Sequence, residues 1–194
     1  MIFETIITTV NLAGEPHIAP FGVRYQVEHV LIAPYKPSTT LENILATKTA
    51  TLNITDDVRV FAGALTNHIN SDNIKLTPLR ATHAQTNGHA GYRLAHVASH
   101  SELRLIEVKD DTARSQLMMQ KIHTETHAPF LGFNRAQAAV IELSILVSRL
   151  HMLPREKIEE ELAYLQIAIN KTAGERELEA WGWLTEKIEH YYAR

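Results

Sequence analysis

The spacing of apolar and polar positions divides the chain into two parts that meet near residue 110. Before that point the apolar residues form short runs rich in Thr, Val and Ile, which is typical of β-strands. After it they recur every three or four residues, as they do on the buried face of a helix. A β-rich segment followed by a helical one predicts an α+β protein with domains at 1–110 and 111–194.

Four runs in the first part are predicted to be strands, at residues 4–10, 17–25, 29–33 and 49–54. The first two are separated by a turn that contains Gly14 and Pro16. Residues 67–91 are polar and predict a long excursion with little regular structure. Two further strands, at 92–97 and 102–108, are expected to pair as a β-hairpin.

Two short helices are expected between these strands. Thr39 and Glu42 have the spacing of a capping box and predict a helix over residues 40–46. Asp57 can cap a second helix. The apolar residues of this second helix fall on one face: Val58, Phe61, Ala62 and Leu65.

Four helices are expected in the second part of the chain. They are a helix over 111–122 capped by Asp111, one over 134–151 capped by Asn134, one that begins at Pro154, and one after Gly174. Their predicted buried stripes are Leu117, Met118 and Ile122 in the first, Ile158, Leu162, Leu165 and Ile169 in the third, and Leu178, Trp181, Leu184, Ile188 and Tyr191 in the last.

The amino-acid composition excludes several kinds of functional site. The absence of cysteine excludes disulfides, thiolate nucleophiles, and zinc or iron–sulfur sites with Cys ligands. The 22 acidic and 19 basic residues give a net charge of −3, which argues against a nucleic-acid partner. No signal peptide is visible, and the longest apolar run, near residues 138–150, is too polar to span a bilayer. We therefore expect a cytoplasmic protein that binds neither membrane nor nucleic acid.

The segment over residues 17–53 contains the clearest candidate for a ligand site. Ser38, Thr39 and Thr40 stand at the entry of a predicted helix, and Lys36 comes two residues earlier. Hydroxyl groups, free backbone N–H groups and the positive end of the helix dipole together suit a phosphate monoester. The same hydroxyls are common as ordinary helix caps, which is the better interpretation of these residues taken alone.

Three stretches of this segment resemble the pattern of the flavin reductase-like, FMN-binding split β-barrels. They are His17-Ile18-Ala19-Pro20-Phe21-Gly22, Ser38-Thr39-Thr40-Leu41-Glu42-Asn43-Ile44 and Thr51-Leu52-Asn53-Ile54. Residues 71–76 are similar to that family's Asp-Lys-Phe loop. The whole chain resembles an uncharacterised branch of the superfamily, a domain of unknown function from methanogens and methylotrophs. Its Gly-Phe-Asn-Arg-Ala helix entry corresponds to residues 132–136.

This resemblance implies a split β-barrel followed by a C-terminal helical subdomain. It also implies a homodimer with FMN as cofactor at the subunit interface. The backbone of Phe21 and Gly22 is then expected near the flavin ring. Contacts with the phosphate or the ribityl chain are carried over to Ser38, Thr39, Thr40 and Asn43.

Gly22 departs from the family pattern, and Arg24 and Asn53 each have two interpretations. Gly22 stands where the family has Ser, which removes one phosphate donor. Arg24, two residues on and on the same strand face, either replaces that donor or pairs with Glu28 as a surface cation. Asn53 is either a flavin contact or a buried amide that holds the barrel together.

Asn134 and Arg135 form a second candidate site for an anionic group. An N-cap leaves N–H groups free, and the guanidinium adds charge at the positive end of the helix. The alternative is structural. Arg135, Glu142 and Arg149 are seven residues apart and can form a ladder that orders the helix at a subunit contact.

The 11 histidines include two pairs with the spacing of metal ligands, His96 with His100 and His123 with His127. Glu125 is available as a third ligand. The first pair falls in a predicted strand and turn, where residues four apart do not share a helical face. Scattered surface histidines explain the pattern better, so we expect no metal. No nucleophile-elbow pattern supports Ser-His-Asp hydrolysis.

These observations favour an FMN-dependent, flavin reductase-like oxidoreductase in which the flavin performs the redox step. The organisms of the similar branch suggest a link to tetrahydromethanopterin-dependent one-carbon metabolism. One alternative is a non-enzymatic FMN binder or electron carrier, and another is an interaction protein whose barrel has lost the flavin. An oxidase for a pyridoxamine phosphate-type substrate would need a second phosphate site, for which Arg135 is the candidate.

Overall fold

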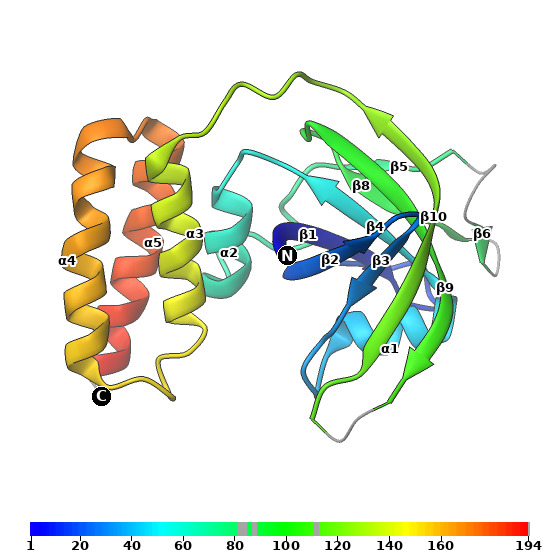
Figure 1. The fold of residues 1–194 in the computed structure, drawn as a ribbon, viewed down its shortest axis with the longest axis horizontal. Helices are drawn as coiled ribbons and strands as arrows, with labels where there is room; N and C mark the ends of the chain where they lie inside the picture. Colours follow the sequence, from blue (N-terminus) through cyan, green and yellow to red (C-terminus); the bar gives the residue numbers. More distant parts are fainter. Residues whose placement is uncertain (81–84, 87–88, 111–112, 194) are drawn as a thin grey trace. The chain divides into compact units, whose positions relative to one another are not determined.

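The computed structural model describes residues 1–80, 85–86, 89–110 and 113–193, and the chain divides into two compact units. The barrel unit consists of Met1–Thr55 and Ser71–Pro129. The helical unit consists of Asp56–Asn70 and Phe130–Arg194 (Figure 1). The chain therefore enters the helical unit twice, and each unit is described by itself below.

Six strands of the barrel unit form a closed barrel in the order β1-β2-β3-β10-β9-β4. Their bounds are β1 Phe3–Val10, β2 Pro16–Gln26, β3 His29–Ile32, β4 Thr49–Ile54, β9 Ser99–Lys109 and β10 Gln116–Thr126. All neighbouring strands are antiparallel. The strands expected at 4–10, 17–25, 29–33 and 49–54 are confirmed as β1 to β4.

The interior of the barrel is filled by side chains that alternate along the strands, as the pleat requires. Its fully buried residues include Ile7, Val23, Ile32, Leu52, Leu103, Leu117 and Met119. Helix α1 (Thr39–Thr47) contributes Leu41 and Ile44 to the same cluster. This packing fixes the N-terminus of α1 against the barrel.

Four short strands lie in the excursion between β4 and β9. They are β5 Leu76–Pro78, β6 Gln85–Thr86, β7 His89–Ala90 and β8 Tyr92–Leu94. Strand β5 pairs with β8, and β6 pairs with β7. The expected hairpin of 92–97 with 102–108 is therefore wrong, because β9 pairs with β10 and β4 instead.

The helix predicted over 111–122 is also wrong. Residues 116–126 form β10, in which Leu117 and Met119 are fully buried and the residues beside them are less so. This is the two-residue period of a strand, and pairing with β3 and β9 satisfies its backbone. The expected cap, Asp111, lies outside the described residues. The barrel unit consequently extends to Pro129, past the boundary expected at 110.

The helical unit contains α2 Arg59–Thr66, α3 Arg135–Val147, α4 Arg155–Thr172 and α5 Glu175–Tyr192. The helices predicted after Asp57, Asn134, Pro154 and Gly174 are confirmed, but the N-cap of α2 is Val58 and not the predicted Asp57. Their shared core includes Val58, Ala62, Leu143, Ile158, Trp181 and Leu184. None of the helices in the described part of the chain is both long and apolar enough to cross a membrane.

The burial predicted for the apolar face of α5 is confirmed in the middle of the helix and wrong at its two ends. Trp181, Leu184 and Ile188 are buried, whereas Leu178 and Tyr191 are exposed. Ala180 takes the buried place next to Trp181. The neighbouring helices decide which edge of the apolar face is covered.

Candidate functional site

The N-terminus of α1 presents a polar surface at the edge of the barrel. Ser38 is the N-cap, and its Oγ accepts a hydrogen bond from the backbone N–H of Leu41 at 3.2 Å. The cap is thus one residue earlier than the capping box had predicted at Thr39. Helical geometry gives the N–H groups of Thr39 and Thr40 no acceptor inside α1, and the Thr39 side chain is exposed.

The loop before α1 is anchored by the segment before β10. Lys36 Nζ forms an ion pair with Asp110 at 2.7 Å. Arg114 donates from Nε to the carbonyl of Ala33 at 2.6 Å, and its guanidinium lies 4.6 Å from the ring centre of Tyr35. Arg114 is not among the predicted site residues, because only the pairing of β10 with β3 brings its guanidinium to this loop.

Thr40 and Asn43 are turned into the protein. Both are buried, and Asn43 Nδ2 donates to Thr9 Oγ1 at 3.0 Å. The carbonyl of Asn43 accepts from Thr47 Oγ1. Of the four helix-entry residues predicted to contact a phosphate, Ser38 and Thr39 are the ones that the structure leaves at the surface.

Phe21, Gly22 and Arg24 lie on β2. The carbonyl of Phe21 accepts a hydrogen bond from Thr5 Oγ1 at 3.0 Å. A Cβ at Gly22 would lie 2.8 Å from Cγ2 of Ile2 and 3.2 Å from a carboxylate oxygen of Glu4. The lack of a side chain at Gly22 therefore matches the close approach of β1, and a carboxylate stands beside it.

Arg24 is exposed, and no ion pair joins it to Glu28 among the described residues. The alternative of a surface pair with Glu28 thus has no support in this structure. The guanidinium stays a candidate for binding an anion.

Asn53 is fully buried, and its amide is saturated within the barrel unit. Nδ2 donates to the carbonyl of Ile6, the hydroxyl of Thr8 and the carbonyl of Thr51. Oδ1 accepts from the backbone N–H of Leu94 at 2.9 Å. This is the second interpretation given for Asn53, an amide that ties β1, β4 and β8 together.

Asn134 and Arg135 belong to the helical unit, whereas the other predicted contacts belong to the barrel unit. Asn134 Oδ1 caps α3 by accepting from the N–H groups of Ala136 and Gln137. Its Nδ2 donates to the carbonyl of Thr172 in α4. The N-cap is therefore engaged in packing two helices.

The proposed ladder along α3 is absent from the described contacts. Arg135, Glu142 and Arg149 are all exposed, and no ion pair joins them among the described residues.

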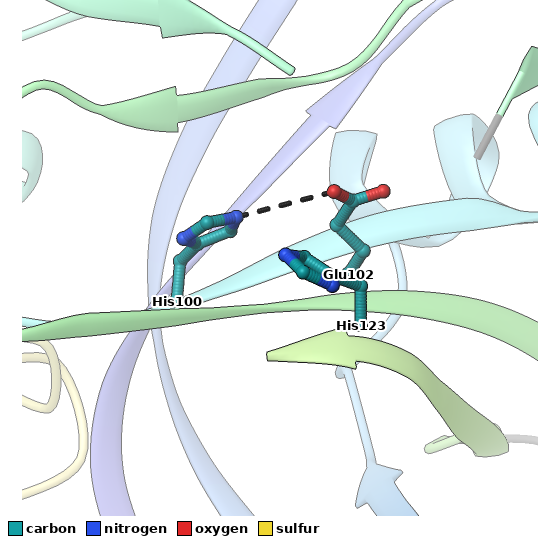
Figure 2. Close-up of side chains that lie close together, drawn as sticks. All are labelled: His100, Glu102 and His123. Carbon is teal, nitrogen blue, oxygen red and sulfur yellow. Dashed lines mark ion pairs between the residues drawn. The ribbon is translucent and has the colours of Figure 1, made fainter. Parts of the chain in front are cut away.

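A second polar cluster lies on β9 and β10, and the sequence did not predict it. His100, Glu102 and His123 have their ligand atoms within 4.8 Å of one another, as do His100, Glu125 and His127. Figure 2 shows the first three side chains converging, with His100 Nε2 4.0 Å from Glu102 Oε1. His100 and Glu102 are each 2% exposed.

The expectation of scattered surface histidines is therefore wrong for this group. The sequence contains a pattern that predicts this cluster if the segments are strands, because residues two apart share one face of a strand. His100 and Glu102 are two residues apart, and His123, Glu125 and His127 follow one another at the same spacing. The helix predicted over residues 111–122 ends beside His123, and residues two apart do not share a face of a helix.

The cluster borders a cavity of about 470 Å³ in the barrel unit. Arg80 and Arg93 also line it. Burial, followed by the nearby His127 and Arg93, lowers the pKa of His100 to about 4. His100 is consequently neutral at pH 7, with a lone pair on one ring nitrogen.

Family comparisons cover both parts of the chain. A model described as the N-terminal domain of a protein of unknown function, DUF447, matches residues 3–128. A second model of the same family matches residues 134–186. No curated protein matches the chain.

Solved structures resemble the whole chain or its barrel. An FMN-bound protein from Methanosarcina mazei, of the same family model, superposes with a TM-score of 0.79 at 18% identity, over 96% of this chain and 94% of its own. The 2-nitrobenzoate 2-nitroreductase NbaA of Pseudomonas fluorescens gives 0.53 at 19% identity, over 64% of each chain. Flavin reductase HpaC, solved with NADP⁺, gives 0.54 at 16% identity, over 67% of this chain and 81% of its own. The likeness shows that the fold is a flavin reductase-like split barrel with a helical C-terminal part.

Proposed function

Because the chain belongs to the DUF447 family, whose two domain models match it in chain order, we propose that it is an FMN-binding flavoprotein and a flavin reductase-like oxidoreductase. The observation that carries the proposal is the polar N-terminus of α1, at the edge of a barrel whose fold is shared with an FMN-bound relative. The nitroreductase and flavin reductase neighbours support the same reaction class.

The residues at α1 fit a phosphate group. Ser38 and Thr39 offer hydroxyls at the surface, and the first turn of α1 offers N–H groups at the positive end of its dipole. Arg114 contacts the loop that leads to α1 through Ala33 and Tyr35, and Arg24 is an exposed guanidinium on β2. Asn43 ties α1 to β1 from the inside through its hydrogen bond to Thr9.

The backbone of β2 at Phe21 is the expected neighbour of the flat ring, whereas side chains of Ile2 and Glu4 occupy the space beside Gly22. The carboxylate of Glu4 beside Gly22 disfavours a phosphate there, which supports the N-terminus of α1 as the phosphate site. Bound FMN would supply the redox chemistry, and the chain would supply binding and orientation.

Finer parts of the proposal rest on the resemblance to the family. They are a homodimer with the flavin at the subunit interface, a cytoplasmic location, and a role in tetrahydromethanopterin-dependent one-carbon metabolism. The electron donor and the acceptor are the compounds to be identified.

The first experiment compares FMN with riboflavin, which lacks the phosphate. Thr39→Ala and Ser38→Gly remove a hydroxyl, and glycine preserves most of the N-cap stability. Each should weaken FMN binding by about 10-fold, the effect of one hydrogen bond to a charged group, and leave riboflavin affinity unchanged. Flavin fluorescence quenching measures both affinities. Thr126→Ala, at an exposed threonine at the end of β10, is the matched control.

The outcomes separate the alternatives. Failure of wild-type protein to bind FMN refutes the proposal and favours an interaction protein. FMN binding without oxidation of NADH or NADPH favours an electron carrier. Sedimentation of the FMN-loaded protein at twice 21.9 kDa supports the homodimer, and sedimentation at 21.9 kDa contradicts it.

A further inference from the structure

The cluster on β9 and β10 owes its geometry to strand pairing. Glu102 stands opposite His123, and His100 stands opposite Glu125. Directly opposed residues of an antiparallel pair project from the same face of the sheet. Leu103, which follows Glu102 and projects from the other face, belongs to the barrel interior, so the cluster lies on the outer face of the barrel.

The excursion before β9 covers this outer face. Leu94 of β8 donates its N–H to Asn53, which stands opposite His100 on β4. Thr77 and Leu79 line the cavity together with the cluster. His100 and Glu102 are therefore buried beneath this cover.

The two ring nitrogens of His100 face different partners. Nε2 lies 4.0 Å from Glu102 Oε1, and Nδ1 lies 2.8 Å from Nε2 of His127. A hydrogen bond joins the second pair. The first pair is too far apart for one, but two atoms that bind the same ion at roughly 2.1 Å each lie at most about 4.2 Å apart.

We propose that His100, Glu102 and His123 bind a divalent transition-metal ion at the edge of the cavity. Two imidazoles and one carboxylate are a set that holds zinc or non-haem iron with open coordination positions. Figure 2 shows the three side chains directed toward a common point. The site is separate from the α1 surface and does not depend on the flavin proposal.

His127 orients the site without binding the ion. A metal-binding histidine commonly donates its second ring N–H to a neighbour, which fixes the ring and its tautomer. The contact from His100 Nδ1 to His127 serves this role. Glu125 and His127 are exposed, whereas His100 and Glu102 are buried, which favours the first set of ligands over the set of His100, Glu125 and His127.

A ligand that completes the coordination of a bound ion could enter from the cavity, which His100, Glu102 and His123 line. Arg80 and Arg93 line this cavity with the cluster, so an exchangeable ligand there meets positive charge. Water or a small carboxylate is the kind of ligand that this combination accepts.

The test uses the full chain, stripped of metal with a chelator and then titrated with Zn²⁺ against a chromophoric competitor. We expect about one Zn²⁺ per chain, and visible d–d bands when Co²⁺ replaces it. Glu102→Gln and His123→Ala should weaken Zn²⁺ binding more than about 100-fold, and His127→Ala about 10- to 100-fold, as for residues that orient a ligand. Glu102→Gln preserves the size of the buried side chain.

His96→Ala is the matched control, because His96 is exposed in the same unit and belongs to neither set of ligands. Its affinity for Zn²⁺ should equal that of the wild type. Circular dichroism verifies that each variant is folded. Wild-type protein that binds no Zn²⁺, or folded Glu102→Gln and His123→Ala variants that bind it as tightly as the wild type, would overturn the assignment.

Discussion

At the residue scale, two buried polar side chains that stand opposite each other have different roles. Asn53 and His100 face each other across β4 and β9. Every polar atom of the Asn53 side chain has a partner within the barrel unit, which makes it part of the framework. His100 is directed toward a carboxylate and two other histidines beside a cavity, which is the setting of a ligand-binding group.

Asn53→Ala should lower the free energy of unfolding by about 3 kcal/mol. The substitution leaves the N–H of Leu94 and the carbonyl of Ile6 buried without their partner, and each such group costs about 1–3 kcal/mol. Urea denaturation measures the loss. Gln26→Ala, at an exposed amide at the end of β2, should change it little. Unchanged stability with weakened FMN binding would instead assign Asn53 to the flavin.

At the scale of elements, an ion pair between Asp57 and Arg59 stabilises the start of α2. Asp57 Oδ1 accepts the backbone N–H of Arg59, and Oδ2 lies 2.6 Å from the Arg59 guanidinium. Arg59 also reaches Glu179 of α5 at 3.2 Å. Burial alone would raise the pKa of Asp57, but the hydrogen bond and charge of Arg59 hold it below its ordinary value.

Asp57→Ala should destabilise the helical unit by about 1–2 kcal/mol at pH 7, because it removes a hydrogen bond and an ion pair to Arg59. Because the pKa of Asp57 is lower in the folded state, its charge stabilises the fold above pH 3.8, and this contribution is lost as the pH falls further. The difference from wild type should therefore shrink at pH 3. Urea unfolding at both pH values checks this, with the neighbouring exposed Asp56→Ala as the control. A difference that does not depend on pH would show that the charge contributes nothing.

At the scale of the whole molecule, the two compact units interleave along the chain. The barrel unit needs β10, and the helical unit includes α2 from the middle of the chain. Val58 and Ala62 of the α2 segment pack in the same core as Leu143 and Trp181. A cut in the chain therefore has different consequences on either side of β10.

A fragment of residues 1–110 should fail to fold, because β3 and β9 lose the strand that joins them. A fragment of residues 1–129 retains all six barrel strands and should retain β-sheet circular dichroism. It should also bind a hydrophobic dye, since the apolar face of α2 loses α3 and α5. A cooperatively folded 1–110 fragment would contradict the closed barrel.

Secondary-structure elements that depend on residues close together in the chain could be predicted from the sequence. The first four strands, the helices after Asp57, Asn134, Pro154 and Gly174, and the polar entry to α1 all follow from local periodicity and capping. The resemblance of residues 17–54 to split barrels added the fold. These signals depend on residues a few positions apart, so they could be recognised without the tertiary structure.

The strand β10 and the cluster around His100 depend on contacts between residues far apart in the chain. Residues 116–126 have apolar positions compatible with either a helix or a strand, and pairing with β3 and β9 selects the strand. That same pairing brings His123 beside Glu102, and the cover from β8 buries His100 and saturates Asn53. Burial and strand register arise from long-range contacts, and no local pattern of residues encodes which distant strand will supply them.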